Sequence, residues 1–130
     1  MNLSNLFKNT NNITEFKKGA TVFTEGAPGD VMYVVMEGEV EVWVNTKLVD
    51  IIKTGQIFGE MAIIDESKRS ATAIARSDSR LAVVDQKLFL YMVQQTPFFS
   101  LEVMRVLADR LRSMNSSGFG SHAPTSFFTK

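Results

Sequence analysis

The chain has 130 residues, of which 45% are apolar and 22% charged, and it contains no cysteine and one histidine. This composition predicts one globular domain with its own core, and it excludes a disordered chain, a disulfide framework and a thiolate metal site. Because 14 basic residues balance 14 acidic ones, no net charge favours a nucleic acid or a membrane surface as partner. The single histidine, His122, lies in a polar tail, so neither a zinc site nor a catalytic triad is expected.

The first 14 residues are predicted to form a short helix over Leu3–Lys8 and a polar linker from Asn9 to Asn12. They show no basic region followed by an apolar stretch, as a secretory signal would. The apolar run Val31–Met36 is far shorter than the ~20 residues that cross a bilayer. No membrane segment is therefore expected, and the cytoplasm is the expected location.

From residue 15 to about residue 85, short runs of β-forming residues alternate with glycine-containing turn signals. Val40, Val42 and Val44 alternate with acidic residues and a tryptophan, which predicts a strand with its valines on one face of a sheet. Further strand-like runs are Ile51-Ile52, Ile57-Phe58, Ala71–Ala75 and Leu81–Val84. Many short strands at this spacing predict a sandwich or barrel with jelly-roll-like connections.

After residue 85 the apolar period becomes helical. Asp85 is a suitable N-cap for a short helix that reaches about Val93, and Thr96-Pro97 opens a longer helix that reaches about Asn115. At 100° per residue the long helix has two apolar faces and one polar face. The first apolar face holds Leu101, Met104, Ala108, Leu111 and Asn115. The second holds Phe99, Val103, Val106, Leu107, Arg110 and Met114. The polar face holds Glu102, Arg105, Asp109 and Arg112.

Such a broad apolar surface exceeds what one packing partner needs. One face is expected to cover the β-region and the other to meet a second subunit, while burial of the whole helix within one chain is the alternative. Residues 116–130 are expected to be a flexible tail, with Phe127-Phe128 as its loose end.

The segment 58–72 carries the residues with recognisable chemistry. Gly59 permits a tight turn, a short helix is predicted over Glu60–Ile64, and a polar loop returns to the next strand at Arg69. A helix N-terminus favours an anion, and the fork of Arg69 suits two phosphate oxygens. Glu60 repels phosphate but accepts hydrogen bonds from hydroxyls, as acidic residues do for ribose. The combination predicts a sugar-phosphate ligand, and a surface ion pair without a ligand is the alternative.

This segment resembles the phosphate-binding cassette of the cyclic nucleotide-binding domain family, which includes bacterial catabolite activator proteins, protein kinase A regulatory subunits and cyclic nucleotide-gated channels. The pattern Phe-Gly-Glu-x-Ala, a short loop and Arg-(Ala/Ser/Thr)-Ala is complete at Phe58–Ala62 and Arg69–Ala71. Upstream, Gly26–Asp30 and Tyr33–Val40 resemble the family's second characteristic hairpin. The resemblance covers about residues 16–115. It implies a mainly β fold, a double-stranded β-helix (jelly-roll) barrel over about 15–85, with a short cassette helix and C-terminal helices over about 86–115.

The resemblance also implies ligand-binding roles. Glu60 binds the ribose 2′-hydroxyl, and Arg69 binds the cyclic phosphate, helped by Ser70 and by backbone N–H groups near Gly59 and Ala62. The other cassette positions in this set are Met61 and Ala71. Val42 and Val49 match positions that line the base and sugar, with plain barrel core as the alternative. Arg110, Met114 and Asn115 fall where the long helix approaches the purine. Arg110 also needs a counterion on its apolar face, and Glu60 is the candidate.

The identity of the nucleotide is indicated by two positions. Ser70, directly after the cassette arginine, favours cAMP, and cGMP is the alternative. Bacterial cAMP-binding relatives usually carry a Thr-Ser pair near the adenine amine, whereas this chain has Met114-Asn115. The Asn115 amide can accept from an exocyclic amine or donate to a carbonyl, so it suits either purine.

No helix-turn-helix segment follows the long helix, so no nucleic acid partner is expected. The chain resembles a free-standing sensor, or the sensor part of something longer, that signals to an unknown output protein through a conformational change. Neither enzymatic activity nor a cofactor is expected. One alternative is a cupin-like metal enzyme, which needs histidines that the β-region lacks. Another is a protein–protein module that keeps the fold without the ligand.

A parallel homodimer through the long helix is expected, with Leu101, Met104, Ala108 and Leu111 along the seam. Bacterial members of the family dimerise in this way. In eukaryotic members the equivalent helix often serves as an intramolecular lid, and that is the alternative for this chain.

Overall fold

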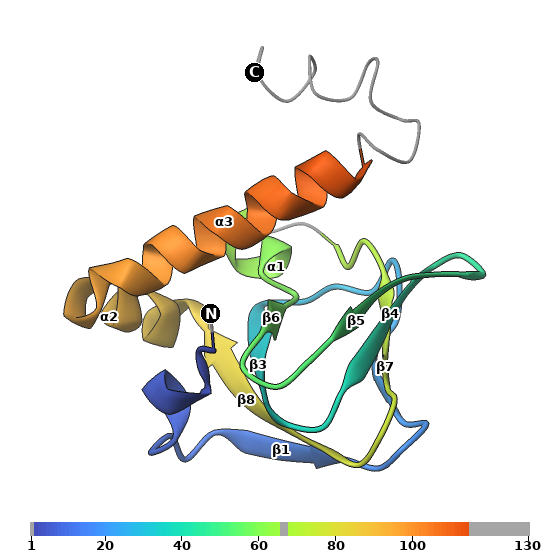
Figure 1. The fold of residues 1–130 in the computed structure, drawn as a ribbon, viewed down its shortest axis with the longest axis horizontal. Coiled ribbons are helices and arrows are strands. Elements are labelled where there is room, and N and C mark those ends of the chain that lie inside the picture. Colours follow the sequence, from blue (N-terminus) through green and yellow to red (C-terminus); the bar gives the residue numbers. More distant parts are fainter. Residues whose placement is uncertain (1, 66–67, 115–130) are drawn as a thin grey trace.

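The computed structural model of the protein describes residues 2–65 and 68–114, which form eight strands and four helices (Figure 1). The strands are β1 (Ile13–Phe16), β2 (Thr21–Phe23), β3 (Val31–Glu37), β4 (Val40–Val44), β5 (Lys47–Ile52), β6 (Ile57–Phe58), β7 (Thr72–Ala75) and β8 (Ser79–Asp85). The helices are the single 3₁₀ turn η1 (Ser4–Phe7), α1 (Met61–Ile64), α2 (Gln86–Gln95) and α3 (Pro97–Met114).

The strands form two antiparallel sheets with the orders β1-β8-β3-β6 and β2-β7-β4-β5. The predicted mainly β architecture with a short helix and a long C-terminal helix is therefore confirmed. Because β6 pairs with β3 through Tyr33 and Phe58, the chain that follows β6 is brought beside the start of β3. That pairing places the short helix α1 at one end of the barrel, below α3 in Figure 1.

Two apolar clusters form the core. One lies between the helices and the β1-β8-β3-β6 sheet and includes Phe7, Met32, Val34, Ile57, Val84, Phe99 and Val103. The other includes Val35, Val40, Ile52, Phe58, Ala73 and Leu81. In the first cluster the ring of Phe99 packs edge-on against Phe7 at 5.8 Å and Phe89 at 5.4 Å, a favoured geometry for aromatic pairs. These contacts attach η1 and α2 to α3.

The predicted helices are found with small shifts at their ends. The Asp85 carboxylate accepts a hydrogen bond from the Leu88 N–H at 2.8 Å, so the predicted N-cap of α2 is confirmed. The helix α2 runs two residues beyond the predicted end, and α3 begins at Pro97 as predicted. Asn115 and the predicted tail 116–130 lie outside the described residues.

Among the side chains of α3 that the structure describes, one departs from the predicted wheel. Phe99 and Val103 are buried, whereas Leu101 and Met104 are 40% and 59% exposed. Glu102 was predicted on the polar face and is buried instead, with its carboxylate paired to Arg105 at 2.8 Å. The prediction was wrong there because a wheel assigns a direction around the helix and not the neighbours that cover it.

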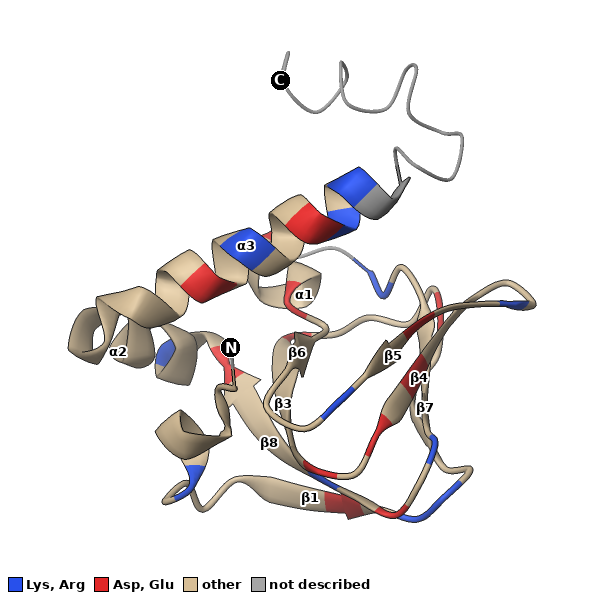
Figure 2. Ribbon diagram, viewed as in Figure 1, with Lys and Arg blue, Asp and Glu red and all other residues tan. Residues whose placement is uncertain are grey.

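Residues of both charge signs are interspersed along α3 (Figure 2). In the described ranges, no helix combines the length and the hydropathy that a bilayer crossing requires.

Candidate functional site

Arg69 is the centre of the candidate site. It is only 7% exposed, although it lies at the end of the loop that leads to β7. Its guanidinium donates from Nη1 to the Gly59 carbonyl at 3.2 Å and from Nη2 to the Val31 carbonyl at 2.9 Å. These two carbonyls are neighbours because β6 pairs with β3. The backbone therefore fixes the position of the arginine on two sides.

Gly59 is required at this position for two reasons. Its φ of +78° lies in the left-handed region, which side chains rarely adopt. A Cβ there would also approach Nη1 of Arg69 to 2.9 Å. The sequence predicted the tight turn, and the structure adds the close approach of the arginine.

Glu60 is the second buried charge of the site, with 2% exposure. Its Oε2 pairs with Nη1 of Arg110 from α3, and Nη2 of Arg110 donates to the Ile57 carbonyl at 2.9 Å. The predicted pairing of Arg110 with Glu60 is confirmed. A single residue of the long helix thus links α3 to the strand end and turn that hold the site.

The charged groups around Arg69 influence one another. Burial lowers the pKa of Arg69, and this effect is opposed by Tyr33, Asp30 and Glu60, which favour the charged guanidinium. Burial raises the pKa of the Tyr33 hydroxyl, and the positive charge of Arg69 opposes that change. Since arginine stays protonated in proteins, the site holds a permanent positive charge beside a buried carboxylate.

Two buried polar atoms in the described part of the chain lack a hydrogen-bond partner, Oε1 of Glu60 and Nε of Arg69. One is an acceptor and the other a donor. A buried polar atom without a partner costs free energy, so native proteins leave few of them without a reason. A ligand with a hydroxyl group and an anionic oxygen would satisfy both atoms.

The other predicted residues of the 58–72 segment lie close to Glu60 or Arg69 in the chain. Ala62 and Ala71 are buried, Met61 is half-buried and Ser70 is exposed. The Ala62 N–H donates to the Gly59 carbonyl at 3.3 Å, just beyond the usual hydrogen-bond range. The predicted helix in this segment begins at Met61 and has four residues. Such a short helix supplies little dipole, so the charge of Arg69 is the main attraction for an anion here.

The predicted residues outside this segment differ in their placement. Val42 is half-buried and packs against the second core cluster. Val49 is 47% exposed on β5, which makes the barrel-core alternative wrong for that residue. Met114 ends α3, and its side chain and the whole of Asn115 lie outside what the structure describes. The predicted contacts of these four residues with a ligand stay predictions.

The sequence predictions missed three residues that contact or closely approach the Arg69 guanidinium. The guanidinium lies over the ring of Phe23, 4.1 Å from its centroid, and 5.9 Å from the centroid of Tyr33. A Cβ at Gly29 would lie 2.5 Å from Cζ of Arg69, so this glycine is also part of the arginine's surroundings. Gly29 and Tyr33 belong to the upstream hairpin whose pattern is recognisable in the sequence, but Phe23 carried no signal beyond that of a strand residue.

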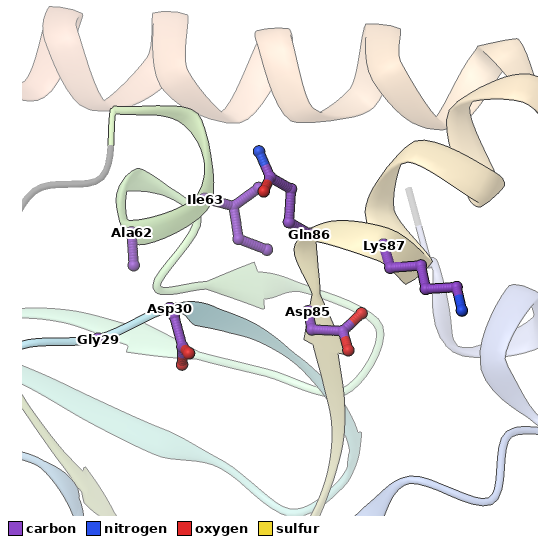
Figure 3. A pocket seen from close by; sticks show the side chains of 7 residues that line it. All are labelled: Gly29, Asp30, Ala62, Ile63, Asp85, Gln86 and Lys87. Carbon is purple, nitrogen blue, oxygen red and sulfur yellow. The ribbon is translucent and has the colours of Figure 1, made fainter.

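A cavity of about 420 Å³ opens beside α1 (Figure 3). Its lining residues come from three segments and are Gly29, Asp30, Ala62, Ile63, Asp85, Gln86 and Lys87. Ala62 is the one predicted site residue among them. Because neither Glu60 nor Arg69 lines this cavity, we place the candidate site at the two buried charges and not here. Among the described residues, no group of three His, Cys, Asp or Glu side chains is placed to hold a metal ion.

Comparison with known proteins matches residues 13–96 to the model of the cyclic nucleotide-binding domain. The CRP-like cAMP-activated global transcriptional regulator of Mycobacterium tuberculosis is 32% identical over 108 residues, which are 79% of this chain and 48% of that protein. A cGMP-dependent protein kinase of Eimeria tenella is 42% identical over 81 residues, which are 62% of this chain and 8% of the kinase. The chain thus spans less than half the length of these relatives.

Among solved structures, the catabolite activator protein of Thermus thermophilus superimposes with a TM-score of 0.73 at 26% identity. The match covers 81% of this chain and 52% of that one. This chain therefore shares its fold with about half of a longer protein.

Proposed function

Because the chain belongs to the family of cyclic nucleotide-binding domains, we propose that it binds a cyclic purine nucleotide, with cAMP preferred, and acts as a sensor module. In this proposal Glu60 accepts a hydrogen bond from the ribose 2′-hydroxyl. Arg69 donates to the cyclic phosphate, and Ser70 adds a hydroxyl beside it. The module itself needs no cofactor and catalyses no reaction.

The observation that carries the proposal is the pair of unsatisfied buried atoms, Oε1 of Glu60 and Nε of Arg69. Arg69 donates to the carbonyl of Gly59, the residue that precedes Glu60, so the donor and the acceptor belong to one small region. A ribose hydroxyl beside a phosphate oxygen offers the complementary donor and acceptor. A protein–protein module that had lost its ligand would gain nothing from leaving these two buried atoms unsatisfied.

The preference for cAMP rests on Ser70 and is tested by thermal unfolding with each nucleotide. The names of the relatives include both a cAMP-activated and a cGMP-dependent protein, so they support either ligand. A nucleotide present at about 100 times its Kd should add about 2.7 kcal/mol to the free energy of unfolding. We expect cAMP to raise the melting temperature at a lower concentration than cGMP. Stabilisation by neither nucleotide would contradict the proposed function, and stabilisation by cGMP at the lower concentration would reverse the preference.

Signalling in this proposal passes through α3. Arg110 joins this helix to Oε2 of Glu60 and to the Ile57 carbonyl, so a ligand bound at Oε1 would share the Glu60 carboxylate with α3. A ligand can shift the position of α3 only by as much as it binds the two arrangements differently. The output partner would then recognise the arrangement that the nucleotide favours.

We further propose a parallel homodimer through α3. Leu101 and Met104 are exposed on this helix, and Ala108 and Leu111 are half-buried on the same side. Phe98 is also 43% exposed at the start of α3. Neighbouring exposed apolar side chains of this kind usually mark an interface.

Met104→Glu is expected to convert the dimer to monomers in sedimentation experiments, because a charge buried in an apolar seam is costly. Met104 suits this test better than Leu111, since it is 59% exposed and contributes less to the core of one chain. Thr46→Glu, in the exposed turn between β4 and β5, adds the same charge far from α3 and should leave the dimer intact. A wild type that stays monomeric at tens of micromolar with and without cAMP would support the lid arrangement instead.

Three further expectations stay predictions. They are the cytoplasmic location, the absence of a nucleic acid partner and the absence of enzymatic activity. The interspersed charges on α3 in Figure 2 offer a polyanion no continuous basic stripe along that helix, which supports the second of them.

A further inference from the structure

We propose that Phe23 is a positioning residue for phosphate binding, because its ring holds the guanidinium of Arg69 in the orientation that leaves Nε for the ligand. This inference rests on the proposed function. It concerns a residue of β2 that lies outside the 58–72 segment and 46 positions before the arginine in the chain.

The contact between Phe23 and Arg69 has the geometry of a cation–π interaction. Cζ of Arg69 lies 4.1 Å from the Phe23 ring centroid, well within the ~6 Å over which the ring quadrupole attracts a cation. Arg69 is only 7% exposed, so water competes little with this attraction. The interaction therefore belongs to the desolvated and stronger kind.

The ring of Phe23 is itself held in place by other rings. It lies 6.0 Å from the Tyr33 ring and 5.8 Å from the Phe58 ring, and these two rings stack at 5.2 Å. The three aromatic residues come from β2, β3 and β6, and therefore from both sheets. Phe23 thus presents a fixed surface to the guanidinium.

The remaining sides of the guanidinium are occupied by the backbone. Nη1 and Nη2 donate to the carbonyls of Gly59 and Val31, and Gly29 lies so close that a Cβ there would clash. Arginine has five N–H donors, and Nε is the nitrogen left without a partner among the described residues. With the ring in place, Nε is the buried donor that a phosphate oxygen would satisfy, on the side of the guanidinium where Gly29 leaves out a side chain. Without it, the plane of the guanidinium can tilt about its two Nη hydrogen bonds.

Calorimetry of cAMP binding tests this role with Phe23→Met, which keeps an apolar side chain of similar length but removes the ring. We expect its Kd to rise about 2- to 30-fold, the range of cation–π contributions from exposed to desolvated sites. Phe23→Tyr retains the ring and should stay within about twofold of the wild type. Because tyrosine also keeps the packing volume of phenylalanine, a role in packing is separated from a role of the ring by comparing the ring-free variants with the Phe16→Leu control. Phe23→Leu is measured beside Phe23→Met as a second ring-free variant.

Phe16→Leu is the matched control. Phe16 is a half-buried aromatic residue that packs against the same core cluster, and no contact with Arg69 is found for it. Its effect on Kd should be below twofold, while its effect on the unfolding temperature should be similar to that of Phe23→Leu. Wild-type affinity for cAMP in both ring-free variants would overturn the role of Phe23 and leave the proposed function standing. A wild type that binds neither cAMP nor cGMP would overturn the proposed function and the inference with it.

Discussion

Replacement of Arg69 by alanine is expected to raise the Kd for cAMP by about 10- to 150-fold, the range for one hydrogen bond to a charged group. The variant removes the permanent positive charge of the site and the unsatisfied Nε donor. It also leaves the Val31 and Gly59 carbonyls without their present donor. Calorimetry of the wild type and the variant measures the change directly.

Arg69→Lys should fall between the wild type and the alanine variant. A lysine keeps the charge but has one nitrogen, which cannot reach two carbonyls and a phosphate together. Arg76→Ala is the matched control, because Arg76 is an exposed arginine whose contacts are the ion pairs with Glu39 and Glu41. Unchanged affinity in Arg69→Ala would end the assignment of the phosphate site.

Replacement of Arg110 by methionine is expected to lower the free energy of unfolding of the unliganded protein by about 3–5 kcal/mol. The change leaves the carboxylate of Glu60, which is 2% exposed, without the guanidinium that pairs with it. Neutralising the other partner of the pair by Glu60→Gln should lower the free energy of unfolding less, by about 1–2 kcal/mol. Arg110 is 33% exposed and can turn toward water, and a glutamine can still accept one of its hydrogen bonds. Denaturant unfolding without ligand measures both variants.

The order of these two effects is the decisive result, because it depends on which of the two charges is buried. Arg105→Met is a suitable control, since Arg105 is an exposed arginine of α3 whose side chain is 56% accessible and pairs within the helix. Its loss should cost less than that of Arg110. The Glu102 side chain keeps 10% of its surface accessible to water, whereas that of Glu60 keeps 2%. Equal stability of Arg110→Met and wild type would show that the link between α3 and Glu60 contributes nothing.

The sequence alone predicted the fold class and proposed the two charged residues of the candidate site. The alternation at residues 40–44 and the helical period after Asp85 predicted a β-domain followed by helices, because side-chain periodicity is a local property of the backbone. The spacing of Gly59, Glu60 and Arg69 predicted a sugar-phosphate site from residue chemistry alone. Even the long-range pair of Glu60 and Arg110 was predicted, since a charge on an apolar helix face needs a partner.

Only the tertiary structure decided what surrounds those charges. Phe23 and the Val31 carbonyl contact Arg69 because β6 pairs with β3 and both sheets meet beside the loop, and strand pairing is not readable from local periodicity. The exposure of Val49 and the burial of Glu102 have the same origin, because each depends on which neighbour covers that face. Residue types and spacing specify the direction in which a side chain leaves the backbone. The packing of distant segments determines what that side chain meets.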